Sequence, residues 1–93
     1  MNAFDRYLAE AQNANLSDKK TFVRIIQTGL ELAGMSLRKA AHTFRTTPGT
    51  VSRWKNGHSA PPVAARRVIV TTLVRRVQRI ATSLTTHSEG GVF

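Results

Sequence analysis

The basic side chains of this sequence are the residues with the clearest chemical consequence. Ten of them, and no acidic residue, lie between Glu31 and Glu89. They are Arg38, Lys39, Arg45, Arg53, Lys55, Arg66, Arg67, Arg75, Arg76 and Arg79. A surface field of one sign attracts polyanions. The chain has a net charge of +9, and this clustering of its basic residues indicates nucleic-acid binding rather than a surface that is charged only for solubility.

Side chains for catalysis or metal binding are sparse. The chain has no cysteine, which excludes a disulfide, a thiolate metal site and a thiol nucleophile. His42, His58 and His87 lack the spacing of metal ligands, and the five carboxylates are scattered. No Gly-rich phosphate loop stands out either. We therefore expect no enzyme, no cofactor and no metal.

The stretch TTPGTVSRWKNG, Thr46 to Gly57, combines a turn-like Pro-Gly step with a helical pattern. Thr47 is a good N-cap, Pro48 suits the first helical position, and Gly57 is a typical C-terminal stop. Val51 and Trp54 lie three residues apart and face inward. The pattern predicts a short helix whose other face is polar and basic.

The apolar spacing of the preceding segments predicts three more helices in an all-α chain of about five. Phe4, Leu8 and Ala11, with Tyr7 beside them, indicate a short docking helix or arm over residues 1–15. A core helix follows, which we expect to be capped by Ser17 at its start and by left-handed Gly34 at its end. A third helix, with Ser36 as its N-cap, continues to Phe44.

The segment 62–84 predicts a long C-terminal helix, although Val68 to Thr72 is entirely β-branched. Its apolar residues fit a helical face better than strand alternation. They are Val63, Ile69, Val70, Leu73, Val74, Val77, Ile80, Ala81 and Leu84. Nine apolar positions exceed the need of so small a core, which favours a homodimer with Leu73, Val77, Ile80 and Leu84 at its interface. The alternative is that this helix only completes the core of one chain.

These elements divide the chain into four segments. A docking helix or arm spans 1–15, a DNA-binding domain 16–60, a long dimerisation helix 61–85 and a flexible tail 86–93. No apolar run approaches the ~20 residues that span a bilayer, and the N-terminus does not read as a secretion signal. We therefore expect a cytoplasmic, nucleoid-associated protein without a membrane partner.

The sequence SLRKAAHTFRTTPGTVSRWKNG, Ser36 to Gly57, resembles a known helix-turn-helix motif. The motif belongs to phage Cro and C1 repressors and related xenobiotic-response-element type regulators. It reads approximately Ser/Thr-Gln-x-x-Leu-Ala-x-x-Leu-Gly-Val-Ser-x-x-Thr-Ile-Ser-x-Trp-Glu-Asn-Gly, and the match has no gap. Leu37, Arg45 and Lys55 depart from the Gln, turn Gly and Glu of that pattern. The single long C-terminal helix replaces two short ones.

This resemblance implies a sequence-specific regulator of transcription, a repressor, that binds double-stranded DNA as a homodimer on a palindromic operator. The helix 47–56 would enter the major groove with its N-terminal end. The residues expected to contact bases are Pro48, Gly49, Thr50 and Arg53, with Arg53 reading guanine. Those expected to contact phosphates are Arg38, Lys39, Thr47, Ser52, Lys55, Asn56 and His58.

Two other functions remain open. A DNA-binding antitoxin or adaptor would use the terminal arms MNAFDRYLAEAQ and THSEGGVF to hold a small protein partner. A basic amphipathic helix on a membrane surface would use the aliphatic and arginine faces of the last helix. The arginines Arg66, Arg67, Arg75, Arg76 and Arg79 would either flank operator phosphates or solubilise that helix.

Overall fold

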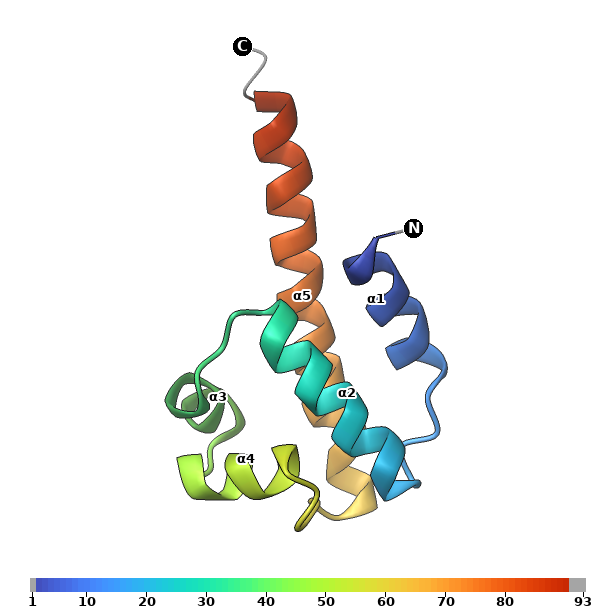
Figure 1. Cartoon of the computed structure of the whole chain (residues 1–93), viewed down its shortest axis with the longest axis vertical. Coiled ribbons are helices and arrows are strands. Elements are labelled where there is room, and N and C mark those ends of the chain that lie inside the picture. Colours follow the sequence, from blue (N-terminus) through green and yellow to red (C-terminus); the bar gives the residue numbers. More distant parts are fainter. Residues whose placement is uncertain (1, 91–93) are drawn as a thin grey trace.

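The computed structural model describes residues 2–90, and of these the side chains of residues 2–84. Five helices make up this part of the chain, and it contains no strand. They are α1 (Ala3–Asn13), α2 (Lys19–Leu32), α3 (Leu37–Phe44), α4 (Pro48–Lys55) and α5 (Val63–Gly90). In Figure 1, α2, α3 and α4 gather around the lower half of α5, α1 lies beside its middle, and the upper end of α5 rises beyond them. The prediction of an all-α chain with a long C-terminal helix is confirmed.

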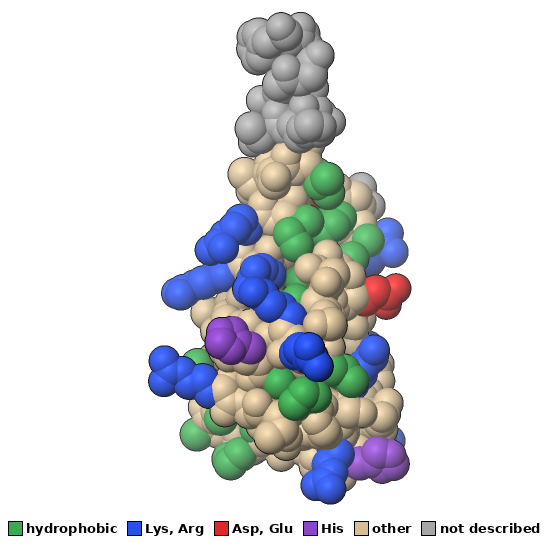
Figure 2. Space-filling model, turned by 90° about the vertical axis from the view of Figure 1, so that its left-hand side faces the viewer, with side chains coloured by type: hydrophobic (Ala, Val, Ile, Leu, Met, Phe, Trp, Pro, Cys, Tyr) green, Lys and Arg blue, Asp and Glu red, His purple; other side chains and the backbone are tan. Residues whose placement is uncertain are grey.

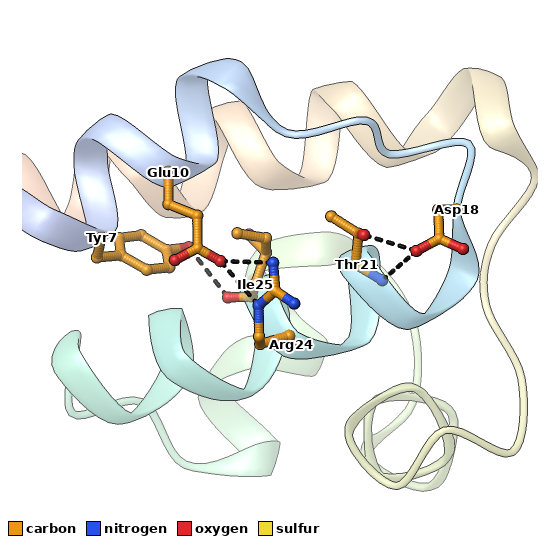
Figure 3. A network of polar contacts seen from close by, with 6 residues as sticks. All are labelled: Tyr7, Glu10, Asp18, Thr21, Arg24 and Ile25. Carbon is orange, nitrogen blue, oxygen red and sulfur yellow. Dashed lines mark hydrogen bonds and ion pairs between the residues drawn. The ribbon is translucent and has the colours of Figure 1, made fainter.

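Side-chain caps begin the helices at polar residues. The hydroxyls of Ser36 and Thr47 accept the backbone N–H groups of Lys39 and Thr50, as the sequence predicts. The cap of α2, however, is Asp18 and not Ser17. Its Oδ2 accepts the N–H of Thr21 at 3.1 Å and the Thr21 hydroxyl at 2.6 Å (Figure 3). These two bonds lower the pKa of Asp18, and a carboxylate also suits the positive end of a helix better than a hydroxyl.

Three consecutive helices end in the same way, with one residue in the left-handed region. Gly34 after α2 has φ of 63°, Arg45 after α3 has 57° and Gly57 after α4 has 78°. In each case the following N–H reaches back five residues to a carbonyl: Met35 to Leu30, Thr46 to Ala41 and His58 to Arg53. This is the Schellman motif, for which glycine is the favoured residue. The two predicted glycine stops are therefore confirmed, and Arg45 takes the same conformation with a side chain.

The core lies between α2 and α5 and is closed by the three shorter helices. Every helix contributes fully or nearly fully buried apolar side chains. The core members are Tyr7, Ala11, Leu16, Phe22, Ile25, Ile26, Leu30, Ala40, Ala41, Val51, Trp54, Val70, Leu73, Val74 and Val77. Apart from Tyr7, whose side chain carries a hydroxyl, no polar or charged side chain is buried among the described residues. Helix α5 therefore runs through the core of the single chain over its first half.

Helix α1 is part of this core rather than a free arm. Tyr7 is 3% exposed, and its hydroxyl donates to the carbonyl of Ile25 on α2 at 3.1 Å (Figure 3). Burial raises the pKa of Tyr7, with a smaller contribution from Glu10. A Cβ on Gly29 would clash with the Tyr7 hydroxyl and with Leu73, so the glycine lets three helices meet. The ion pair between Arg24 and Glu10, at 2.7 Å, joins α1 and α2 at the surface.

The predicted apolar face of α5 divides between the core and the surface. Leu73 and Val77 are 1% and 0% exposed within the single chain, Ile80 is half-buried, and Leu84 is 54% exposed. Leu73 and Val77 are thus unavailable to a second chain, and only the outer part of the predicted dimer seam is accessible. The helix continues to Gly90, into the segment 86–93 predicted as a flexible tail, and residues 91–93 lie outside the described residues.

Candidate nucleic-acid interface

A tight turn of three residues sets α4 against α3. The N–H of Arg45 points to the carbonyl of His42, that of Thr46 points to Ala41, and Thr47 then caps α4. Ala40 and Ala41 are buried, which lets the two short helices approach closely. This is the local geometry of a helix-turn-helix.

The inner face of α4 is held by apolar packing. Val51 is fully buried, and Trp54 is 6% exposed. The Trp54 ring lies edge-on to Phe22 of α2, with centroids 6.3 Å apart, and tilted to Phe44 of α3 at 6.4 Å. Trp54 is therefore a core residue, as its spacing from Val51 predicts, and not a platform for stacking bases.

The opposite side of α4 carries the four predicted base-contacting residues. Pro48, Gly49 and Arg53 are exposed, and Thr50 is half-buried. A Cβ on Gly49 would meet nothing nearer than the Thr47 hydroxyl at 3.9 Å, so open space lies before this first turn. The hydroxyls of Thr47 and Thr50 bond each other at 2.9 Å. The N-terminal turn of α4 is thus slim and accessible.

The predicted phosphate contacts surround this turn on α3, on α4 and on the loop after it. Arg38, Lys39, Thr47, Lys55, Asn56 and His58 are exposed, and Ser52 is half-buried. Asn56 donates from its amide to the Ser52 hydroxyl at 3.4 Å. Among the described residues, the only ion pair is that of Arg24 with Glu10, so no cation of α3 or α4 is neutralised. Figure 2 shows this side of the molecule, with basic side chains spread across it and little acidic surface.

Two arginines at the start of α5, Arg66 and Arg67, bind carbonyls of the chain itself. Arg66 donates to the carbonyls of Pro61, Leu16 and Ser17 at 2.8, 2.9 and 3.0 Å, and its guanidinium lies 5.7 Å from the centre of the Phe22 ring. Arg67 donates to the carbonyls of Ala11 and Ala14 at 3.2 and 2.9 Å.

These bonds satisfy carbonyls at the end of α1 and in the α1–α2 connection, which are otherwise without helical partners. Arg66 and Arg67 thus have a role within the fold that the sequence does not predict. The side chains of Arg75, Arg76 and Arg79, further along α5, form no ion pair within the described residues.

A polar contact that the sequence does not signal holds the other end of α4. The side-chain amide of Gln27, on α2, donates to the carbonyl of Lys55 at 2.5 Å. Gln27 is one exposed polar residue among several on α2, and its sequence position gives no hint of a partner 28 residues away.

Three further features of the described part of the chain concern its metal-ligand groups, the length and hydropathy of its helices and its surface grooves. No three His, Asp or Glu side chains within it lie close enough together to share a metal ion. None of its helices is long and apolar enough to cross a membrane. An open groove of about 490 Å³ lies between α2 and Gly57, just after the end of α4.

Comparisons with family models, with curated proteins and with solved structures find no match to this chain.

Proposed function

We propose that the chain is a sequence-specific double-stranded DNA-binding regulator of transcription, similar in its motif to the Cro/C1-type repressors, with α4 as its recognition helix. The observation that carries the proposal is the asymmetry of α4. One face is fixed in the core by Val51 and Trp54, and the other presents Pro48, Gly49 and Arg53 to open space.

The dimensions of the major groove, about 12 Å wide, admit a helix, and the N-terminal turn of α4 is free of bulky side chains. Thr47 and the positive helix end favour a phosphate near this turn. Arg53, one turn further along, has the reach and the two parallel donors to bind guanine O6 and N7. The cations of α3 and of the loop after α4 fit the DNA backbone on either side.

The same geometry supports the regulator over the adaptor. An adaptor that grips its partner through the N-terminal arm needs α1 to be available, whereas Tyr7 and Ala11 are buried in the chain's own core. Homodimer formation stays part of the proposal. Its contact surface would be the accessible outer part of α5 around Ile80 and Leu84, because Leu73 and Val77 are occupied.

The test is selection of bound duplexes from a random library, followed by binding measurements on selected and random sequences. We expect the selected duplex to bind at least about a thousandfold more tightly than a random one. Arg53→Ala should remove the preference at one base pair of each half-site, which is worth about 1–3 kcal/mol for a bidentate arginine. Equal affinity of the wild-type protein for selected and random duplexes would refute the proposal.

A further inference from the structure

The carbonyl groups in the last turn of α4 differ in where their partners come from. Ser52, Arg53 and Trp54 receive N–H groups from the residues just after the helix: Asn56 at 2.9 Å, His58 at 2.9 Å and Gly57 at 3.2 Å. Lys55 is the exception, because its carbonyl receives the amide of Gln27 from α2. Within the described residues, this is the one side-chain hydrogen bond that joins α4 to another helix.

The remaining contacts of α4 with the core are apolar. The Trp54 ring against Phe22 and Phe44, together with Val51, fixes the depth of the helix in the core. The hydrophobic effect that holds these contacts is not directional. A hydrogen bond at one end is directional, because it weakens steeply as its angle changes. Gln27 therefore adds a directional contact to the non-directional packing of Trp54.

The surface on both sides of Gln27 is hollowed. Grooves of about 490 and 400 Å³ lie along α2, and Gln27 lines both of them. The first is bordered by Val23 and Gly57, and the second by Met35 and Asn56. Gln27 thus bridges α2 and the C-terminal end of α4 where the rest of the boundary is open.

A rotation of α4 at its C-terminal end would displace its N-terminal turn. Helix α4 has eight residues and is therefore about 12 Å long at 1.5 Å per residue. A tilt of about 10° around the packed Trp54, about 9 Å from Pro48, would move the first turn by about 1.5 Å. The bidentate contact of an arginine with guanine depends on hydrogen-bond lengths and angles that such a shift would spoil.

We propose that Gln27 is a positioning residue for DNA sequence recognition, which aligns Arg53 and the first turn of α4 by holding the Lys55 carbonyl from α2. This inference rests on the proposed function. In this proposal Gln27 does not contact DNA itself. It acts by fixing the orientation of α4.

The first experiment measures specificity. Gln27→Leu removes the donor at similar side-chain size, and Gln27→Arg keeps an N–H donor as the matched control. We expect Gln27→Leu to lower the affinity ratio of selected to random duplexes about five- to tenfold, since part of a bidentate contact is lost. Gln27→Arg should retain the ratio, although its added charge raises affinity for all sequences.

A double-mutant cycle distinguishes positioning from a separate contribution. In an Arg53→Ala background, Gln27→Leu should have little further effect on the ratio, because the residue that it aligns is gone. The same fold-change in both backgrounds, or an unchanged ratio in Gln27→Leu alone, overturns the inference. If wild-type protein discriminates between duplexes and Gln27→Leu does so equally well, the inference fails while the proposed function stands.

A second experiment needs no DNA. Backbone amide chemical shifts of Gln27→Leu and wild-type protein are compared along α4 by NMR. A tilted helix should change shifts as far as Gly49, whereas Gln27→Arg should change them only near the substitution. Changes in Gln27→Leu that are confined to residue 27 and the 55–58 turn would show that α4 does not move, and would refute the positioning role.

Discussion

The first half of α5 and the pair α3–α4 carry the same kinds of side chain but use them in opposite ways. At the base of α5, Arg66 and Arg67 donate five hydrogen bonds to carbonyls of the chain itself. On α3 and α4, Arg38 and Arg53 are exposed and form no ion pair. Arginine therefore binds the chain's own carbonyls at the base of α5, and on α3 and α4 it stays exposed without an ion pair within the described residues.

The apolar residues of the two regions show the same contrast. Val70, Leu73, Val74 and Val77 fill the core from α5 over two turns. In α4, only Val51 and Trp54 are buried, and the remaining positions face outward. A helix whose apolar residues are all buried in its own chain contributes to stability. A helix that is buried on one face only can present its other face to a partner. The comparison therefore separates residues expected to change stability from those expected to change binding.

The largest effect on stability is expected from a charge in the buried half of α5. Val77→Asp would bury an unpaired carboxylate in a position that is 0% exposed, at a cost of about 3–5 kcal/mol. A domain of this size has a free energy of unfolding of about 5–10 kcal/mol, so most of its stability would be lost. Circular dichroism during urea unfolding measures this change.

Leu84→Asp is the matched control, because Leu84 is on the same helix but 54% exposed. It should leave the free energy of unfolding within about 0.5 kcal/mol of wild type. If the chain forms a homodimer through this surface, sedimentation should show Leu84→Asp as a monomer. A Val77→Asp protein that stays folded and stable would contradict the division of α5 into a core half and an outer half.

The next effect separates two arginines of equal charge. Arg66→Ala removes three hydrogen bonds to carbonyls and the contact with Phe22, and should cost about 2–3 kcal/mol of stability. Arg53→Ala removes an exposed side chain and should change stability by less than about 0.5 kcal/mol. Urea unfolding of both variants gives the comparison. Equal stabilities would show that the carbonyl contacts of Arg66 contribute nothing.

A smaller effect concerns the salt dependence of DNA binding. Lys39→Ala and Arg67→Ala each remove one positive charge. Lys39 is an expected phosphate contact, so its loss should reduce the slope of log K against log salt by about 1. Arg67 is bound to the carbonyls of Ala11 and Ala14, so its loss should leave the slope nearly unchanged. Titrations at several salt concentrations measure both slopes, and a shared reduction would indicate that charge acts without regard to position.

Local sequence signals predict most of the helix boundaries of this fold. The hydroxyl caps of α3 and α4, Pro48 at a helix start and glycine at two helix ends depend on residues within a few positions of one another. In α5, the helical spacing of the apolar residues predicts the structure correctly, although the run Val68 to Thr72 is β-branched and by itself favours a strand. These features are local in the chain and can be predicted without tertiary structure.

The features that sequence reasoning missed depend on distant partners. Arg66 meets carbonyls 49 and 50 residues away, and Gln27 meets Lys55 across 28 residues. Leu73 and Val77 belong to an apolar face that is identical in pattern whether it meets its own chain or a second one. The choice depends on where α1 and α2 pack, and helical periodicity carries no information about that.

The smallest expected effect concerns Arg45, in the turn between α3 and α4. Its φ of 57° is the conformation that glycine adopts after α2 and α4, and a Cβ there costs about 1 kcal/mol. Arg45→Gly should therefore raise the free energy of unfolding by about 0.5–1 kcal/mol. Arg45→Ala removes the same charge but keeps the Cβ, so it should give no such gain. Urea unfolding of the two variants isolates the backbone strain, and their DNA affinities should fall together because both lose one cation. If Arg45→Ala is as stable as Arg45→Gly, the left-handed residue of this turn is not strained by its side chain.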